Sequence, residues 1–212
     1  MPDALRAGVV LSALFALVAL TVLVLRTLSF GRRPFYSKDA GSRASGIVYV
    51  FGKGMMPWEK ESARKHPLTY SAGVIYHAGI FAALICLFCA VFSVSPPPSL
   101  LFVLRGALVA GGACGLSLLV KRFFSSNLRK LSCPDDYAAN AIVTLFVIVA
   151  AVRVWQPVFV TTGEWFFYVV SILMFLYVPV GKIRHCFFFF YSRVLLGVFF
   201  GRRSALPTGQ PR

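Results

Sequence analysis

Five long apolar runs dominate this sequence and limit what it can fold into. A membrane-crossing helix needs about 20 apolar residues, because each adds about 1.5 Å against a hydrocarbon core about 30 Å thick. Such runs cover residues 8–30, 71–94, 99–120, 138–155 and 164–185. Charged residues make up only 14% of the chain, whereas a soluble domain contains about a quarter. The sequence therefore predicts an all-α polytopic membrane protein, a bundle of five transmembrane helices.

The breaks between the runs predict a single domain over residues 1–200, followed by a tail over 201–212. Three prolines at 96–98 separate the second run from the third, because proline lacks the N–H that a helix interior requires. After the fifth run, residues 186–200 remain apolar and aromatic. Either the fifth helix continues past Pro179 with a kink, or this segment lies in the membrane interface.

Lysine and arginine are confined to alternate connections, which predicts the orientation of the helices. The connections at 95–99 and 156–163 contain neither residue, whereas the segments 31–68, 121–137 and 182–212 contain almost all of them. Because cytoplasmic segments are enriched in lysine and arginine, we expect the N-terminus outside and the C-terminus in the cytoplasm of a prokaryotic cell, with the helices in its inner membrane. This asymmetry accounts for the net charge of +15, so no nucleic-acid partner is expected.

Ionisable groups inside a membrane are costly, so each one is a candidate for function. The interior of the spans contains no acidic residue, and the Ser, His and Asp residues suggest no catalytic triad. Cys86 and Cys89 form a CxxC pattern, for which packing is a simpler interpretation than redox or metal chemistry. A small transporter is disfavoured, because internal repeats and buried acids are missing from the sequence.

Three histidines remain, and two of them are expected at similar depth. His77 lies about two turns inside the second predicted span, and His185 lies at the inner end of the fifth. His66 precedes Pro67 at the membrane surface, where a solvated side chain is expected. A core histidine without a ligand is the simpler interpretation of His77 or His185 alone. Two at matching depth on two helices predict a shared ligand pair.

Two neutral imidazoles on facing helices suit the axial positions of a b-type haem. A flat macrocycle also needs small residues beside it, which Gly111 and Gly112 could provide, although glycine in membrane helices more often serves helix packing. The haem carboxylates need cationic partners, and Lys182 and Arg184 flank His185. These six residues form the predicted cofactor site, with His77 and His185 as the iron ligands.

The pattern resembles the gamma subunit of respiratory nitrate reductase. The resemblance covers residues 10–193 and includes His77, the Gly-Gly-Ala-Cys-Gly sequence at 111–115 and the Val-Pro-Val-Gly-Lys-Ile-Arg-His sequence at 178–185. The chain is more similar still to membrane cytochrome b subunits of heterodisulfide-reductase-like and sulfite-reduction-associated complexes. The Ser-Cys-Pro-Asp-Asp-Tyr sequence at 132–137 and the basic, aromatic tail carry this closer similarity.

This resemblance implies an electron-transfer subunit that exchanges electrons with menaquinone or ubiquinone and anchors a cytoplasmic iron–sulfur or molybdenum enzyme. Two-haem relatives have a further histidine about three turns after His77 and another about five turns before His185. Here those positions hold Leu87 and Phe167, with Phe88 and Phe166 beside them. We therefore expect one haem b, near the cytoplasmic face, and an outer pocket that is filled by these side chains or left as a cavity.

Three further expectations concern the surroundings of the haem. The catalytic centre should belong to the partner, which would dock on residues 31–66 and 121–137, while Asp135 and Asp136 could instead cap the fourth helix. A quinone should lie deep, near Leu87 and Phe167 or beside the inner haem. Arg105 and Arg153 could orient a quinone or simply extend to the outer headgroups. The alternative function is a haem-free structural anchor.

Overall fold

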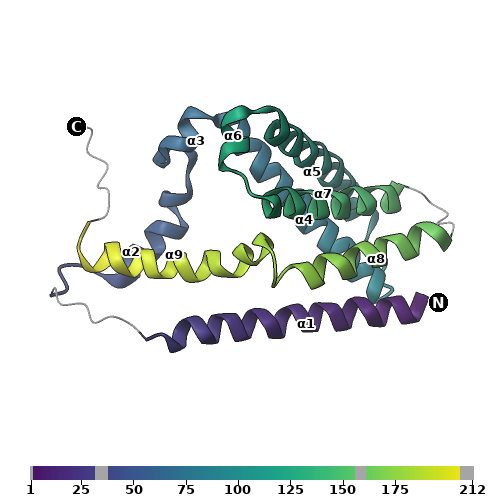
Figure 1. The fold of residues 1–212 in the computed structure, drawn as a ribbon, viewed down its shortest axis with the longest axis horizontal. Coiled ribbons are helices and arrows are strands. Elements are labelled where there is room, and N and C mark those ends of the chain that lie inside the picture. Colours follow the sequence, from purple (N-terminus) through teal and green to yellow (C-terminus); the bar gives the residue numbers. More distant parts are fainter. Residues whose placement is uncertain (1, 32–37, 156–160, 206–212) are drawn as a thin grey trace. The chain divides into compact units, whose positions relative to one another are not determined.

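The computed structural model describes residues 2–31, 38–155 and 161–205 (Figure 1). The protein is all-α: it is 86% helical, and the described ranges contain no strand. Five helices are long and apolar enough to cross a membrane, so the predicted class of multi-pass membrane protein is confirmed.

The described elements are helical segments of very different lengths. Proline occupies the first position of four of the long helices, at Pro2, Pro67, Pro98 and Pro134, where its missing N–H has no partner to lose. In chain order the elements are α1 (Pro2–Ser29), α2 (Arg43–Phe51), η1 (Lys53–Met55), η2 (Pro57–Glu59), α3 (Glu61–Lys65), α4 (Pro67–Val91), α5 (Pro98–Phe124), α6 (Ser126–Leu131), α7 (Pro134–Trp155), α8 (Thr161–Tyr177), η3 (Lys182–Arg184) and α9 (His185–Arg202).

Four of the predicted spans coincide with α1, α4, α5 and α7, but the fifth is divided. α8 ends at Tyr177, and the next long helix, α9, begins at His185. Pro179 lies in the turn between them, and Gly181 N–H closes the turn by donating to the carbonyl of Tyr177 at 2.8 Å. The continuous helix expected over 164–185 is therefore interrupted at the proline.

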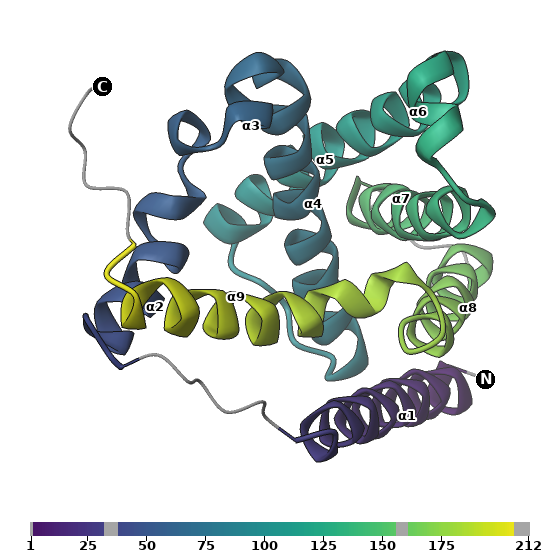
Figure 2. The same cartoon turned by 60° about the vertical axis from the view of Figure 1, so that its left-hand side comes forward.

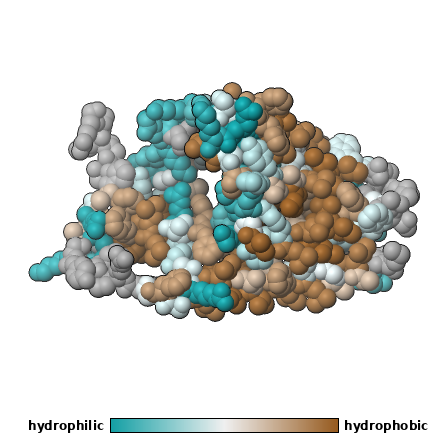
Figure 3. Space-filling model, in the orientation of Figure 1, coloured by the Kyte–Doolittle hydropathy of each residue, from teal (hydrophilic) through white to brown (hydrophobic). Residues whose placement is uncertain are grey.

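The described residues form two compact units. Unit 1 comprises Met1–Ala19 and Leu68–Ile183, and unit 2 comprises Leu20–Pro67 and Arg184–Arg212. The buried core of unit 1 contains aromatic and aliphatic side chains from α4, α5, α7 and α8, among them Leu87, Phe146, Phe167 and Tyr168. In Figure 3, hydrophobic residues cover most of the visible surface of α7 and α8, as expected for helices that face lipid.

The long helices of unit 1 alternate in direction, and polar contacts join their ends. At one end, here called the Asp136 end, α5 finishes beside the starts of α4 and α7. Lys121 donates to the Thr69 hydroxyl at 2.5 Å, and Arg122 lies 3.4 Å from Asp136. Lys182, which follows α8, donates to the same carboxylate at 2.7 Å.

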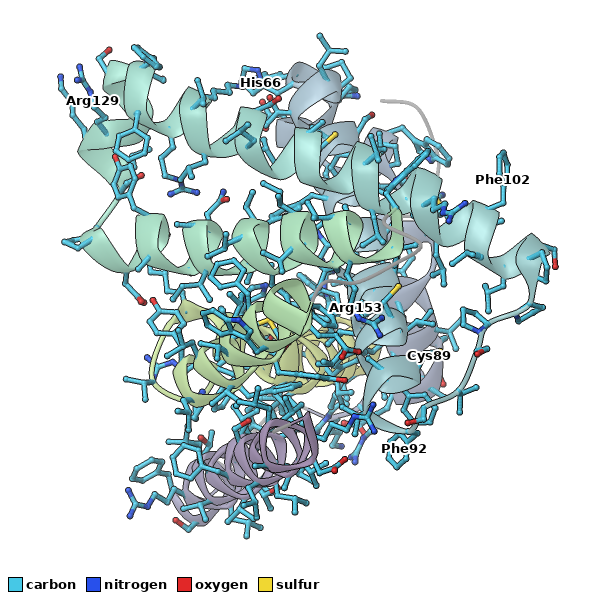
Figure 4. The ribbon with its side chains drawn as sticks, turned by 90° about the vertical axis from the view of Figure 1, so that its right-hand side faces the viewer. His66, Cys89, Phe92, Phe102, Arg129 and Arg153 are labelled. Carbon is cyan, nitrogen blue, oxygen red and sulfur yellow. The ribbon has the colours of Figure 1, made fainter. Side chains whose placement is uncertain are left out.

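The opposite end of unit 1, here called the Glu164 end, joins the remaining helix ends. Arg105 at the start of α5 donates to the carbonyl of Val154 at 3.1 Å. The Tyr168 hydroxyl donates to the carbonyl of Ala90 at 3.2 Å, and Arg153 lies 3.6 Å from Glu164. Figure 4 shows Phe102 and Arg129 near opposite ends of α5, one close to each of these polar clusters.

Unit 2 is organised by the packing of α2 against α9, which lie side by side in Figures 1 and 2. Glycines allow the close approach: a Cβ on Gly197 would lie 2.6 Å from Ile47 Cα, and one on Gly46 would lie 2.7 Å from Gly201 Cα. Gly197 and Gly201 form a GxxxG pattern, which is typical of closely packed membrane helices. The basic connection 31–68 therefore contains a helix, α2, that packs on the C-terminal helix α9.

Candidate functional site

One ring nitrogen of His77 is engaged by the backbone of its own helix. It lies on α4 in unit 1 with its side chain exposed, while the preceding Tyr76 points into the core. Nδ1 lies 2.7 Å from the carbonyl oxygen of Gly73, one turn earlier. Because a carbonyl can only accept, Nδ1 carries the proton, and in the neutral ring Nε2 then carries the lone pair. Metal-binding histidines commonly have such a second contact, which fixes the tautomer and the ring orientation.

His185 and His66 belong to unit 2. His185 is exposed and is the first residue of α9. The sequence predicted it at the inner end of the fifth span. His66 is exposed between α3 and α4 (Figure 4), which agrees with the solvated position expected for it. The described residues contain no group of three or more His, Cys, Asp or Glu side chains that could hold a metal ion, and a haem with two histidine ligands requires none.

The two positions that hold histidine in two-haem relatives are filled by the core of unit 1. Leu87 and Phe167 are both buried. The Phe167 ring stacks on Phe146 with centroids 5.8 Å apart, and the Arg153 guanidinium lies over it at 5.6 Å. Phe88 and Phe166 are exposed, so only the first pair fills the interior. The outer pocket was expected either to be filled by side chains or to remain a cavity. The burial of Leu87 and Phe167 favours a pocket filled by side chains.

Gly111 and Gly112 take the alternative role that the sequence left open, which is helix packing. A Cβ on Gly111 would lie 2.6 Å from Gly79 Cα, so α4 and α5 cross with their backbones in contact at this point. A Cβ on Gly112 would meet Ile148 of α7 at 3.4 Å. Both glycines are buried against neighbouring helices.

Lys182 is part of an ion cluster at the Asp136 end. Its ammonium donates to the Asp136 carboxylate, which also accepts from the backbone N–H of Cys133 at 2.9 Å. This second bond is one half of a capping box at the start of α7, so the helix-capping role considered for Asp136 is confirmed. Arg184 is exposed in unit 2. Of the two predicted partners for haem carboxylates, Lys182 is thus already engaged within unit 1.

The two arginines considered for quinone binding have structural partners at the Glu164 end. Arg105 donates to the carbonyl of Val154, near the end of α7, and lies over the Trp155 ring at 5.2 Å. Arg153 pairs with Glu164 and is close enough to Cys86 to interact electrostatically. A further arginine, Arg6 of α1, donates to the Tyr168 hydroxyl at 3.4 Å. These contacts favour the structural interpretation of both predicted residues.

A buried polar network near His77 was missed by the sequence analysis. The Tyr76 hydroxyl lies 2.9 Å from the Thr144 hydroxyl, which donates to the Asn140 side-chain oxygen at 2.8 Å. Gly115 makes room for the Tyr76 ring, because a side chain there would collide with it. The available signal was the pair Asn140 and Thr144, two polar residues one turn apart in an apolar run. The network joins α4 to α7 directly beside the exposed histidine.

All five cysteines are free thiols. Cys86 is buried and Cys89 is half-buried on α4, as expected for packing residues. A comparison of the chain with protein family models, with characterised proteins and with solved structures finds no match. The site is therefore interpreted from its own geometry.

Proposed function

We propose that this protein is the membrane cytochrome b subunit of a respiratory oxidoreductase complex and binds one haem b through His77 and His185. The geometry of His77 is the observation that supports this most directly: the ring is exposed, and the Gly73 carbonyl holds it in the tautomer whose Nε2 can bind iron. When bound, the haem would supply one-electron transfer between membrane quinone and a cytoplasmic partner. The chain's own residues would bind, orient and shield it.

The proposed orientation places the Asp136 end of unit 1 on the cytoplasmic side of a prokaryotic inner membrane. Lysine and arginine in the segments 38–65 and 121–130 support it, because cytoplasmic connections are enriched in these residues. We propose that an iron–sulfur protein of the heterodisulfide-reductase type, or a molybdenum enzyme, docks on these segments. The catalytic centre would then belong to that partner.

The packing of unit 1 narrows the two proposed locations for the quinone, menaquinone or ubiquinone. The first was the space that an outer haem would leave near Leu87 and Phe167, but both side chains are buried in the core. The second lies beside the inner haem. The interior packing therefore favours a quinone near the cytoplasmic half of the bundle.

The test is the haem content of three single variants of the purified full-length chain, produced with an adequate haem supply. His77→Ala and His185→Ala should each lose most of the b-type band in a reduced-minus-oxidised spectrum. His66→Ala is the matched control and should keep the wild-type haem content, because this exposed histidine lies outside the predicted spans. A melting curve for each variant shows whether it is folded.

Two results would overturn the proposal. A wild-type chain without a b-type band would support the alternative function, a haem-free structural anchor. If both His77→Ala and His185→Ala are folded and retain full haem content, the ligand assignment is wrong even though a haem is present.

A further inference from the structure

The C-terminal helix α9 has the length and composition of a membrane span, yet its surroundings differ from those of the other four. Only 6% of its apolar window is buried, against 22% to 39% for α1, α4, α5 and α7. Its 18 residues would extend about 27 Å, close to the thickness of a bilayer core. Length alone therefore leaves open whether α9 crosses the membrane.

The chain enters α9 directly after a segment at the Asp136 end of unit 1. Lys182, in the η3 turn that leads directly into α9, donates to Asp136 at the start of α7. The preceding helix α8 contacts both ends of α7. Near its start, Glu164 pairs with Arg153 at the end of α7, and its last residue, Tyr177, donates to Asp135 at the start of α7. α8 therefore runs the whole length of α7 in the opposite direction and, at 17 residues, is just long enough to be the fifth crossing.

The end of α9 is held by the connection between α1 and α4. The carbonyl of Arg202 accepts hydrogen bonds from the N–H groups of Ala40 and Gly41, at 2.7 and 3.1 Å, and its guanidinium pairs with Asp39. This connection leads into the start of α4, at the Asp136 end. The longest described element within it, α2, has nine residues and would extend only about 14 Å, too short to cross a bilayer.

Both ends of α9 thus belong to the same side of the membrane. We infer that α9 does not cross the bilayer and that it lies on the Asp136 side with its apolar surface in the lipid. This inference uses no haem ligand and is independent of the proposed cytochrome function.

The side chains of α9 suit a lipid surface. Six large apolar residues are between 36% and 61% exposed: Phe187, Phe190, Val194, Leu195, Leu196 and Phe199. Arg193, the only charged residue between 186 and 201, donates to the carbonyl of Val50 on α2 at 3.4 Å, so its charge is directed at α2. Water would not solvate this surface favourably, whereas the boundary between headgroups and acyl chains would.

Basic residues at both ends of α9 fit anionic headgroups. Arg184 precedes the helix, and Arg203 follows its last residue. Arginines at helix ends place their charge among lipid phosphates while their stems remain in apolar surroundings. The occupant of this face is therefore the anionic lipid surface on the Asp136 side.

The first experiment measures on which side the tail lies. Single cysteines replace Ser204, Ser126 and Ser95 in a chain whose exposed Cys133 and Cys186 are serine, and a membrane-impermeant maleimide is added to sealed vesicles of either orientation. Ser126→Cys lies in the connection between α5 and α7. Ser204→Cys should be labelled from the same side of the vesicle as Ser126→Cys, and it should not be labelled from the side that labels Ser95→Cys. Labelling together with Ser95→Cys would show that α9 crosses the membrane and would overturn the inference.

The second experiment identifies what covers α9. A nitroxide is attached to Val194→Cys in the full chain, reconstituted in equal parts of phosphatidylethanolamine and phosphatidylglycerol, with Val109→Cys on α5 and Lys130→Cys on α6 as references. We expect the Val194 label to be more accessible to oxygen than to a water-soluble nickel complex, at a shallower depth than the Val109 label. Accessibility to nickel equal to that of the Lys130 label would overturn the lipid assignment and favour a protein partner.

Discussion

At the scale of single residues, a buried packing position and an exposed histidine are adjacent within one turn of α4. Tyr76 points inward and joins α4 to α7 through Thr144, whereas His77 points outward with its tautomer held by Gly73. Gly79, on the same helix, lies against Gly111 so closely that neither can carry a side chain without a shift of the backbone. The glycines near the histidine therefore position α4, and through it the histidine.

This close approach predicts a strong difference between two alanine substitutions on α5. In Gly111→Ala the new methyl group would lie 2.6 Å from Gly79 Cα, so the helices must separate, at a cost of about 1–3 kcal/mol in the free energy of unfolding. Gly106→Ala is the matched control, because a Cβ there meets nothing within 4 Å. It should leave stability unchanged or raise it by up to about 1 kcal/mol. Melting curves in detergent compare the two, and equal melting temperatures would contradict the crossing geometry.

At the scale of elements, α2 and α9 are joined by a polar latch at one end of their glycine contact. Asp39 pairs with Arg43, at 2.9 Å, and with Arg202. The hydrogen bond from Arg43 is the largest cause that lowers the pKa of Asp39, and the interaction with Arg202 lowers it further. The latch joins a segment that precedes α4 to the last turn of α9, so it holds the C-terminal helix to the connection between α1 and α4.

The lowered pKa gives the latch a defined pH dependence. The Asp39 carboxylate is favoured in the folded protein, so its contribution to stability is fully present above the unfolded pKa, about 4, and is lost as the pH falls through the lower folded value. The melting temperature of the wild type should exceed that of Asp39→Asn at neutral pH, and the difference should shrink progressively below about pH 4. A difference that does not change on acidification would show that the ion pair contributes nothing.

At the scale of the whole molecule, the interior of unit 1 bears on how many haems the proposed cytochrome could hold. Leu87 and Phe167 cannot ligate iron, and both are buried among the side chains of α4, α7 and α8. The packing there, including the stacked Phe146 and Phe167 rings, is that of an apolar core. If the proposed haem is bound, this packing leaves no second pair of ligands at these two positions.

We predict one haem per chain, measured as pyridine haemochrome against protein concentration. The physical reason is that the second pair of ligand positions is occupied by apolar side chains and that His66, the remaining histidine, lies outside the predicted spans. His66→Ala should leave the ratio at one. A wild-type ratio of two would contradict the assignment and would require ligands of another type.

The sequence by itself determined the helices α1, α4, α5 and α7 and the membrane class. Length and continuity of an apolar run are local properties, and a lipid environment requires that every backbone N–H and C=O be paired within such a run. It also located the exposed His77 and the capping Asp136, because both roles depend on residues within one helical turn.

Only the tertiary structure decided the features that depend on residues far apart in the chain. Pro179 marked a break, but the turn in which Gly181 donates to Tyr177 decided that α9 is a separate helix. The contacts of Lys182 with Asp136 and of Arg202 with Ala40 are the observations from which we infer that α9 does not cross the membrane. Gly111 was compatible with a flat cofactor or with another helix until Gly79 was found against it. What Gly111 or Lys182 contacts depends on which surfaces meet in the folded protein. The sequence around a glycine or a lysine is the same whether its partner is a cofactor or another helix.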